Sequence, residues 1–116
     1  MRKKVYHLST CSTNQRIIKE LRIGDEFEYQ DIKTQSITPA QIEEMHTISG
    51  TYEALFSRRA MKFRARGLHE KQLSEADYKA LILEEYTFLK RPVFLIGEKI
   101  FIGNAKKTVA QVSENL

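Results

Sequence analysis

The sequence predicts an α/β protein in which a β-α-β unit, a helical insert and a β-β-α unit follow one another around a mixed four-stranded sheet. Three observations indicate this class. Strand-like segments lie near both ends of the chain, a long stretch of helical periodicity separates them, and a two-residue hairpin signal precedes the last helix. Strands and helices in this order are typical of a layered α/β domain.

The first thirty residues are expected to form a strand, a helix and a second strand. Residues 4–8 are rich in strand-favouring side chains and are followed by a Ser-Thr pair. A helix is expected from residue 12 or 13, because apolar side chains recur at helical spacing over residues 17–21, and Gly24 is placed to end it. Residues 26–30 alternate with period two, which predicts a second strand with one buried face.

A helical insert is predicted at about residues 36–89, with three helices. The first begins at Thr38-Pro39-Ala40-Gln41, where threonine caps, proline suits the first helical position and glutamine completes a capping box, and Gly50 ends it. A second helix is predicted over residues 51–66. A third begins at Ser74, a suitable cap.

The segment after the insert predicts an antiparallel hairpin and a closing helix. Residues 92–96 and 99–102 are apolar strands, and the Gly97-Glu98 pair between them suits a type II′ turn. Val109 and Val112 on a polar background predict a short final helix. Because no repeat, low-complexity stretch or flexible linker interrupts the chain, residues 1–116 are expected to form one domain.

Composition narrows the classes of function. The longest apolar runs have four residues, far fewer than the ~20 of a membrane-spanning helix, and no apolar stretch of signal-peptide length follows the basic start. A single cysteine excludes an internal disulfide and fits a reducing cytoplasm, and the three histidines show no metal-binding spacing. A net charge of +4 without a recognised nucleic-acid motif makes direct nucleic-acid binding an unfavoured interpretation.

Cys11 is the main candidate for chemistry. A thiol at the amino end of a helix faces free N–H groups and the positive end of the helix dipole, which favour the thiolate. Ser12 and Thr13 could add hydrogen bonds to it. The alternative interpretation is a small buried hydrophobic side chain, which is the usual role of a free cysteine.

A basic segment in the insert is the second candidate. It places five cations in nine residues without an acid, namely Arg58, Arg59, Lys62, Arg64 and Arg66. Residues 58, 62 and 66 share one helical stripe, so a bound anion or an acidic protein partner would relieve their repulsion. The alternative is a solvated charged face.

A cysteine after the first strand and a proline opening the third resemble the skeleton of the thioredoxin and glutaredoxin folds. Several short segments together resemble the arsenate reductase family of glutaredoxin-like proteins, which includes the Spx regulators. These segments are Cys11-Ser12-Thr13-Asn14, Gly50-Thr51-Tyr52-Glu53, Ser57-Arg58-Arg59 and Lys90-Arg91-Pro92-Val93, followed by Gly103. The resemblance covers essentially the whole chain.

The resemblance implies a thioredoxin-like fold with Pro92 in the cis isomer opposite the cysteine. It also implies a thiol oxidoreductase in which Cys11 is the nucleophile and Arg91, with Arg58 or Arg59, binds a small oxyanion or a thiol or disulfide substrate. An external thiol would complete the reduction, supplied by glutathione with glutaredoxin or by thioredoxin. No bound cofactor and no metal are expected.

This chain departs from the family at positions that matter. Asn104 stands where the reductases carry a further arginine, Gln15 where a basic residue is frequent, and Asn14 where the Spx branch has a second cysteine. The set of arginines that would bind arsenate is therefore incomplete, and so is the cysteine pair that would form a redox switch. The alternative function, which the turn residues support and the missing second cysteine opposes, is a non-enzymatic Spx-like regulator. Its turn at Gly50, Thr51 and Glu53 and its basic helix would dock on the RNA polymerase alpha subunit.

Overall fold

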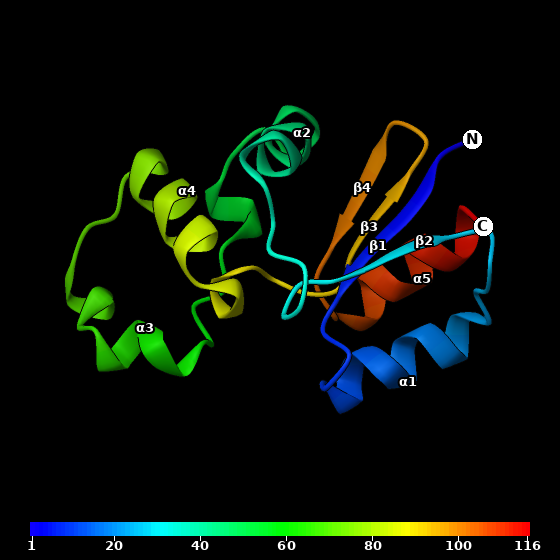
Figure 1. The fold of residues 1–116 in the computed structure, drawn as a ribbon, viewed down its shortest axis with the longest axis horizontal. Helices are drawn as coiled ribbons and strands as arrows, with labels where there is room; N and C mark the ends of the chain where they lie inside the picture. The colour runs from blue at the N-terminus through cyan, green and yellow to red at the C-terminus, as the bar shows by residue number, and fades with distance from the viewer. The chain divides into compact units, whose positions relative to one another are not determined.

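The computed structural model describes all residues 1–116 and contains a mixed four-stranded sheet and five α-helices (Figure 1). The chain divides into two compact units, residues 1–35 with 91–116, and residues 36–90. The helices are α1 (Ser12–Leu21), α2 (Pro39–Ser49), α3 (Met61–Ala65), α4 (Glu75–Glu84) and α5 (Lys106–Glu114). No helix is long and apolar enough to cross a membrane.

The sheet belongs to the first unit and confirms the predicted fold class. Its strands are β1 (Lys3–His7), β2 (Glu28–Asp31), β3 (Val93–Ile96) and β4 (Lys99–Ile102), in the order β2-β1-β3-β4. β1 pairs with β2 in parallel, whereas the β1–β3 and β3–β4 pairs are antiparallel. β2 begins two residues later than expected, because Phe27 N–H donates to Gly24 O at 3.2 Å and closes a turn there.

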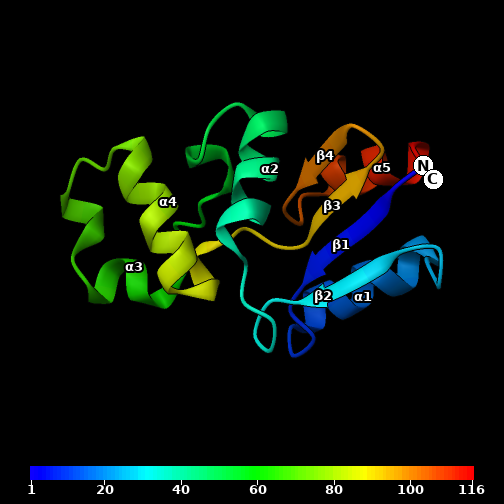
Figure 2. The same ribbon diagram turned by 45° about the horizontal axis from the view of Figure 1, so that its top comes forward.

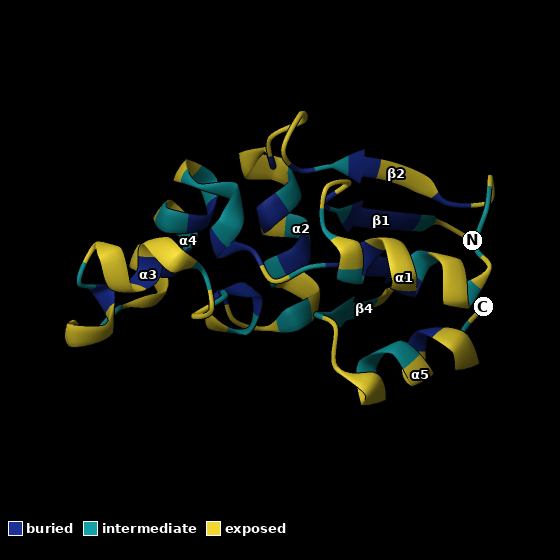
Figure 3. Ribbon diagram, turned by 90° about the horizontal axis from the view of Figure 1, so that it is seen from below, coloured by how far each residue is buried: buried dark blue, intermediate teal, exposed yellow.

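α1 and α5 cover one face of this sheet (Figures 1 and 2). The core between them consists of six buried apolar side chains, Val5, Ile17, Phe27, Phe94, Ile96 and Val112. The Phe27 and Phe94 rings meet edge to face at 6.0 Å. The sides of α1 and α5 that face away from the sheet are largely exposed, as amphipathic periodicity predicts (Figure 3).

A residue with a positive φ angle lies in the turn that ends α1, and another lies in the turn that joins β3 to β4. α1 ends before Arg22, which adopts the left-handed conformation with φ 54° and donates its N–H to Lys19 O at 3.1 Å. Arg22, not Gly24, therefore ends this helix. In the hairpin, Ile96 pairs with Lys99 and Gly97 has φ 61°, so the predicted two-residue turn with glycine first is confirmed.

In the second unit the predicted caps are confirmed, but the predicted helix over residues 51–66 is wrong. Thr38 and Ser74 each form a capping box, and Gly50 ends α2 with φ 88°. Residues 51–66 instead form a 3₁₀ turn, Glu53–Leu55, an extended segment and the short α3. The extended segment arises because Phe56 pairs with Leu89, Ser57 N–H donates to Phe88 O and Lys90 N–H donates to Leu55 O.

Phe56 is the centre of the second unit's core. It is fully buried, and its ring lies 5.2 Å from Phe88, 4.9 Å from Tyr78 and 5.9 Å from Phe63. This aromatic cluster explains why the non-local pairing of Phe56 overrides the local helical periodicity. The expectation that residues 1–116 form a single domain stays a prediction.

Candidate functional site

The strand ends that carry the candidate residues meet at one end of the sheet. β1 and β2 are parallel, so their carboxyl ends coincide, and the pairing of Tyr6 with Val93 places the start of β3 there too. The Arg91–Pro92 peptide bond, just before β3, is cis. The Gly103 N–H, just after β4, donates to Pro92 O at 2.9 Å. Cys11, Arg91 and Pro92 therefore belong to the same end of one sheet.

Cys11 is the residue that caps the amino end of α1. Its backbone is extended (φ −89°, ψ 116°), its carbonyl accepts from Gln15 N–H at 3.0 Å and its N–H donates to Leu8 O at 3.0 Å. The side chain is half-buried, so the sulfur is neither packed away nor fully solvated. The first N–H groups of a helix have no intrahelical partner, and they and the helix dipole favour a negative charge at this position.

Asn14 is the side chain that contacts the sulfur. Its Nδ2 lies 3.4 Å from Cys11 Sγ, and its Oδ1 accepts the Leu8 N–H at 3.0 Å. Ser12 is exposed and Thr13 half-buried, and neither hydrogen-bonds to Sγ. In the sequence Asn14 marks only the place of a missing second cysteine. The sequence signal for its contact with the sulfur is its position one helical turn after Cys11, from which an amide side chain can contact the Cys11 side chain.

Asp31, at the end of β2, anchors the loop that carries Cys11. Its carboxylate accepts from the Ser9 hydroxyl, and also from the N–H groups of Ser9 (3.4 Å) and Lys33 (3.2 Å). The Ser9 hydroxyl bond is the main reason that the pKa of Asp31 lies below its usual range. From the other side, Gln15 Nε2 donates to Ser9 O at 2.6 Å. The β1–α1 loop is thus held at Ser9 by Asp31 and Gln15, neither of which the sequence singled out as a site residue.

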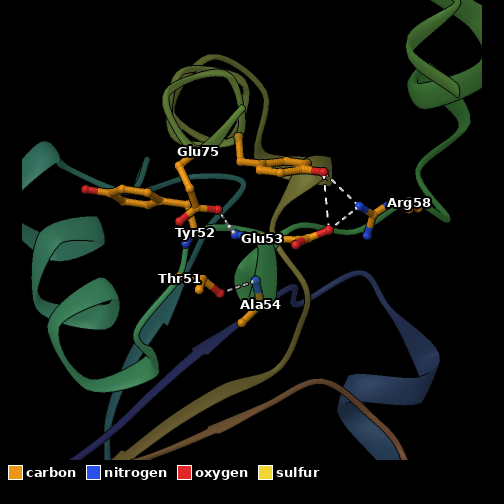
Figure 4. A network of polar contacts seen from close by, with 7 residues as sticks. Thr51, Tyr52, Glu53, Ala54, Arg58 and Glu75 are labelled. Atoms are coloured by element: carbon orange, nitrogen blue, oxygen red, sulfur yellow. Dashed lines mark hydrogen bonds and ion pairs between the residues drawn. The ribbon is translucent and has the colours of Figure 1, made fainter. Parts of the chain in front are cut away.

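The two sets of candidate arginines belong to different units. Arg91 lies in the same unit as Cys11, whereas Arg58 and Arg59 lie in the unit of residues 36–90. Arg58 Nη2 donates to Glu53 Oε2 at 2.7 Å and to the Tyr78 hydroxyl at 2.8 Å (Figure 4). Arg58 therefore has an internal carboxylate partner, whereas Arg59 is exposed and has no ion pair.

The basic segment is largely neutralised from within its own unit. The three cations of the predicted stripe each meet a different acid: Arg58 with Glu53 at 2.7 Å, Lys62 with Glu85 at 2.6 Å and Arg66 with Glu84 at 2.5 Å. These acids relieve the repulsion among the three cations. The pKa of Glu85 lies below its usual value chiefly because of its hydrogen bond from Lys62.

The turn at residues 50–53 is held in a defined shape. The Glu75 carboxylate accepts from the N–H groups of Tyr52 (2.7 Å) and Glu53 (3.1 Å), and Thr51 Oγ1 accepts from Ala54 N–H at 3.1 Å (Figure 4). Tyr52 is buried, while Thr51 and Glu53 are exposed. A carboxylate from α4 therefore fixes a turn that presents two polar side chains to solvent.

Comparisons with known proteins support the fold and assign the family. The structure resembles an arsenate reductase from Vibrio cholerae, with a TM-score of 0.78 and 18% identity over 100% of this chain and 98% of that one. It also resembles an ArsC family related protein from Bacteroides fragilis (TM-score 0.77, 18% identity, 97% and 98% covered). An arsenate reductase related protein from Brucella melitensis gives a TM-score of 0.71 at 18% identity, with 100% and 97% covered.

These likenesses show the thioredoxin-like fold. No curated protein matches the chain. The model of the ArsC family matches residues 6–112 of the 116. The match thus takes in the end of β1, the cysteine loop, the whole second unit and most of α5, and this chain belongs to the ArsC family.

Proposed function

We propose that this protein is an arsenate-reductase-like thiol oxidoreductase in which Cys11 is the single nucleophile and an external thiol is the reductant. The observation that carries the proposal is the placement of the Cys11 sulfur, half-buried at the amino end of α1 and 3.4 Å from the Asn14 amide nitrogen. Family membership supports the same role. An amide donor and a helix amino end both favour the thiolate, which is the reactive form of cysteine.

With a disulfide substrate, the Cys11 thiolate attacks one sulfur and the S–S bond breaks. The leaving thiolate takes the electron pair and a proton from solvent, and a mixed disulfide stays on Cys11. An external thiol then attacks the substrate-derived sulfur and releases Cys11. With an oxyanion such as arsenate, the Cys11 sulfur bonds to the central atom and one oxygen leaves as water. Two external thiols then reduce that central atom by two electrons and depart as one disulfide, and the bond to Cys11 breaks, which releases the reduced oxyanion and the Cys11 thiolate. Because Cys11 is the only cysteine, both routes need a thiol from outside the chain.

Arg91 is the anion-binding residue in this proposal. It lies directly before the cis Pro92, at the end of the sheet that also carries Cys11. A guanidinium can bind an oxyanion or a carboxylate through two parallel hydrogen bonds. Arg58 belongs to the other unit, where it hydrogen-bonds to Glu53 and Tyr78.

Alkylation of Cys11 by iodoacetamide tests the activation of the thiol. Folded protein is expected to react at lower pH than the same chain in denaturant, because the fold stabilises the thiolate. With one cysteine, a single adduct measured by mass spectrometry reports this sulfur alone. Equal pH profiles in the two states, or no reaction before unfolding, would mean that Cys11 is inert packing and that the proposal is wrong.

A second candidate function is docking on the RNA polymerase alpha subunit through the turn at residues 50–53. The observation in its favour is that Glu75 holds this turn in one shape through Tyr52 and Glu53, which lowers the ordering cost of binding.

The docking candidate predicts that the immobilised protein retains the alpha subunit at low and moderate salt. Glu75→Gln is expected to weaken retention several-fold, because the two N–H groups bind different carboxylate oxygens and the amide replaces one of these oxygens with an NH₂ donor. Glu70→Gln, at an exposed acid that makes only a 3.8 Å contact with His69, is the matched control. Recovery of nothing at either salt concentration would remove this candidate.

A further inference from the structure

Asn14 is an unusual residue to find buried beside a thiol. Its side chain is 1% exposed, and the only other buried polar or charged residues are Lys4 and Gln30. A buried amide is costly unless its donor and acceptor both find partners. The Asn14 oxygen accepts a hydrogen bond from Leu8 N–H, and the Asn14 NH₂ group donates one to the Cys11 sulfur.

The Leu8 N–H determines which end of the amide faces the sulfur. Leu8 N–H is a donor, so the oxygen of Asn14 must turn to it and the NH₂ group must turn to Sγ. Cys11 N–H in turn donates to Leu8 O at 3.0 Å. The backbone after β1 and the Asn14 side chain thus form a closed set of hydrogen bonds that aims an N–H donor at the thiol.

A donor aimed at sulfur discriminates between the two protonation states of Cys11. An N–H bond to a charged acceptor is about twice as strong as one to a neutral acceptor, so it favours the thiolate over the thiol. The amide oxygen, which would favour the neutral thiol if it faced the sulfur, instead accepts the Leu8 N–H.

We infer that Asn14 is a positioning residue that stabilises and orients the Cys11 thiolate through Nδ2, with its own orientation set by Leu8 N–H. The inference rests on the proposed function, because it explains how the nucleophile is activated. It also gives position 14 a different role from that of a second cysteine: an amide can stabilise the thiolate but cannot resolve a mixed disulfide.

Asn14→Asp is the sharpest test, because it keeps the shape and the acceptor for Leu8 N–H but replaces the donor with a carboxylate oxygen. The pH midpoint of Cys11 alkylation is expected to rise by about one unit, which is about tenfold slower alkylation at a fixed pH below both midpoints. Arg16→Gln is the matched control. It makes the same change in net charge on α1, but at an exposed ion pair with Glu20. The midpoint is expected to move by less than about a third of the shift in Asn14→Asp.

Asn14→Ala provides a second variant if Asn14→Asp does not fold. It removes the donor without adding charge, so its midpoint is expected to rise by a smaller amount. Thermal unfolding of both variants verifies that the alkylated species is folded. A folded variant with the wild-type pH profile would show that Asn14 has only a structural role, and the inference would be overturned.

The same data separate this inference from the proposed function. The comparison of folded and denatured wild type tests whether the fold activates Cys11 at all. If it does and the Asn14 variants leave the midpoint unchanged, only the role of Asn14 is wrong. If folded and denatured wild type react alike, the proposed function and the inference both fail.

Discussion

Cys11→Ser is expected to abolish thiol-dependent turnover, by roughly 10³-fold or more, while the protein stays folded. A hydroxyl is a far weaker nucleophile than a thiolate, and no second cysteine can take over. Serine fits the half-buried position and can still accept the Asn14 hydrogen bond, so little change in thermal stability is expected. The measurement is reduction of arsenate and of a glutathione mixed disulfide, each coupled to glutaredoxin or to thioredoxin.

A thiol at another position provides the control for this variant. Ser113 is exposed on α5, so the double variant Cys11→Ser/Ser113→Cys restores an accessible thiol away from the candidate site. It is expected to be as inactive as Cys11→Ser. Unchanged turnover in Cys11→Ser, or recovery in the double variant, would contradict a specific role for Cys11.

Phe56→Ala is expected to destabilise the unit of residues 36–90 by about 3–5 kcal/mol. The fully buried ring contacts Phe63, Tyr78 and Phe88, and its removal leaves a cavity that these rings can only partly fill. Such a loss is a large share of the ~5–15 kcal/mol by which domains are stable. Chemical denaturation followed by circular dichroism gives the free energy of unfolding.

Hydrogen exchange of Phe56→Ala shows whether the two units unfold together. If residues 1–116 are one cooperative domain, exchange should rise in both units, and Phe94→Ala in the core of the first unit should give the same pattern. If exchange rises only over residues 36–90, the single-domain prediction is wrong. A loss of stability below about 1 kcal/mol would contradict the assignment of Phe56 to the centre of this core.

Local signals in the sequence were sufficient for the helix ends of the second unit. Thr38, Ser74 and Gly50 act through residues within one turn of themselves, so their spacing alone predicts them. The helix predicted over residues 51–66 failed for the opposite reason. Phe56 pairs with Leu89, 33 positions away, and no local pattern encodes that partner.

The candidate site divides in the same way. Cys11 at a helix amino end and Arg91 before a proline follow from order along the chain. The role of Asn14 depends on the folded loop, which places the Leu8 N–H beside the Asn14 oxygen. The partner of Arg58, Glu53, is only five residues away in the sequence, whereas the partner of Lys62, Glu85, is 23 residues away. Hydrogen-bond geometry of this kind arises only when the chain has folded.

The polarity of the sheet has a practical consequence for handling the protein. Cys11, Asp31 and Arg91 lie at one end of it, and the Gly97-Glu98 turn at the other. The four residues of β3 separate the two ends by about 14 Å at ~3.4 Å per residue. Glu98 is exposed, so a peptide tag inserted after it would anchor the molecule to a surface with the Cys11 end of the sheet away from the support.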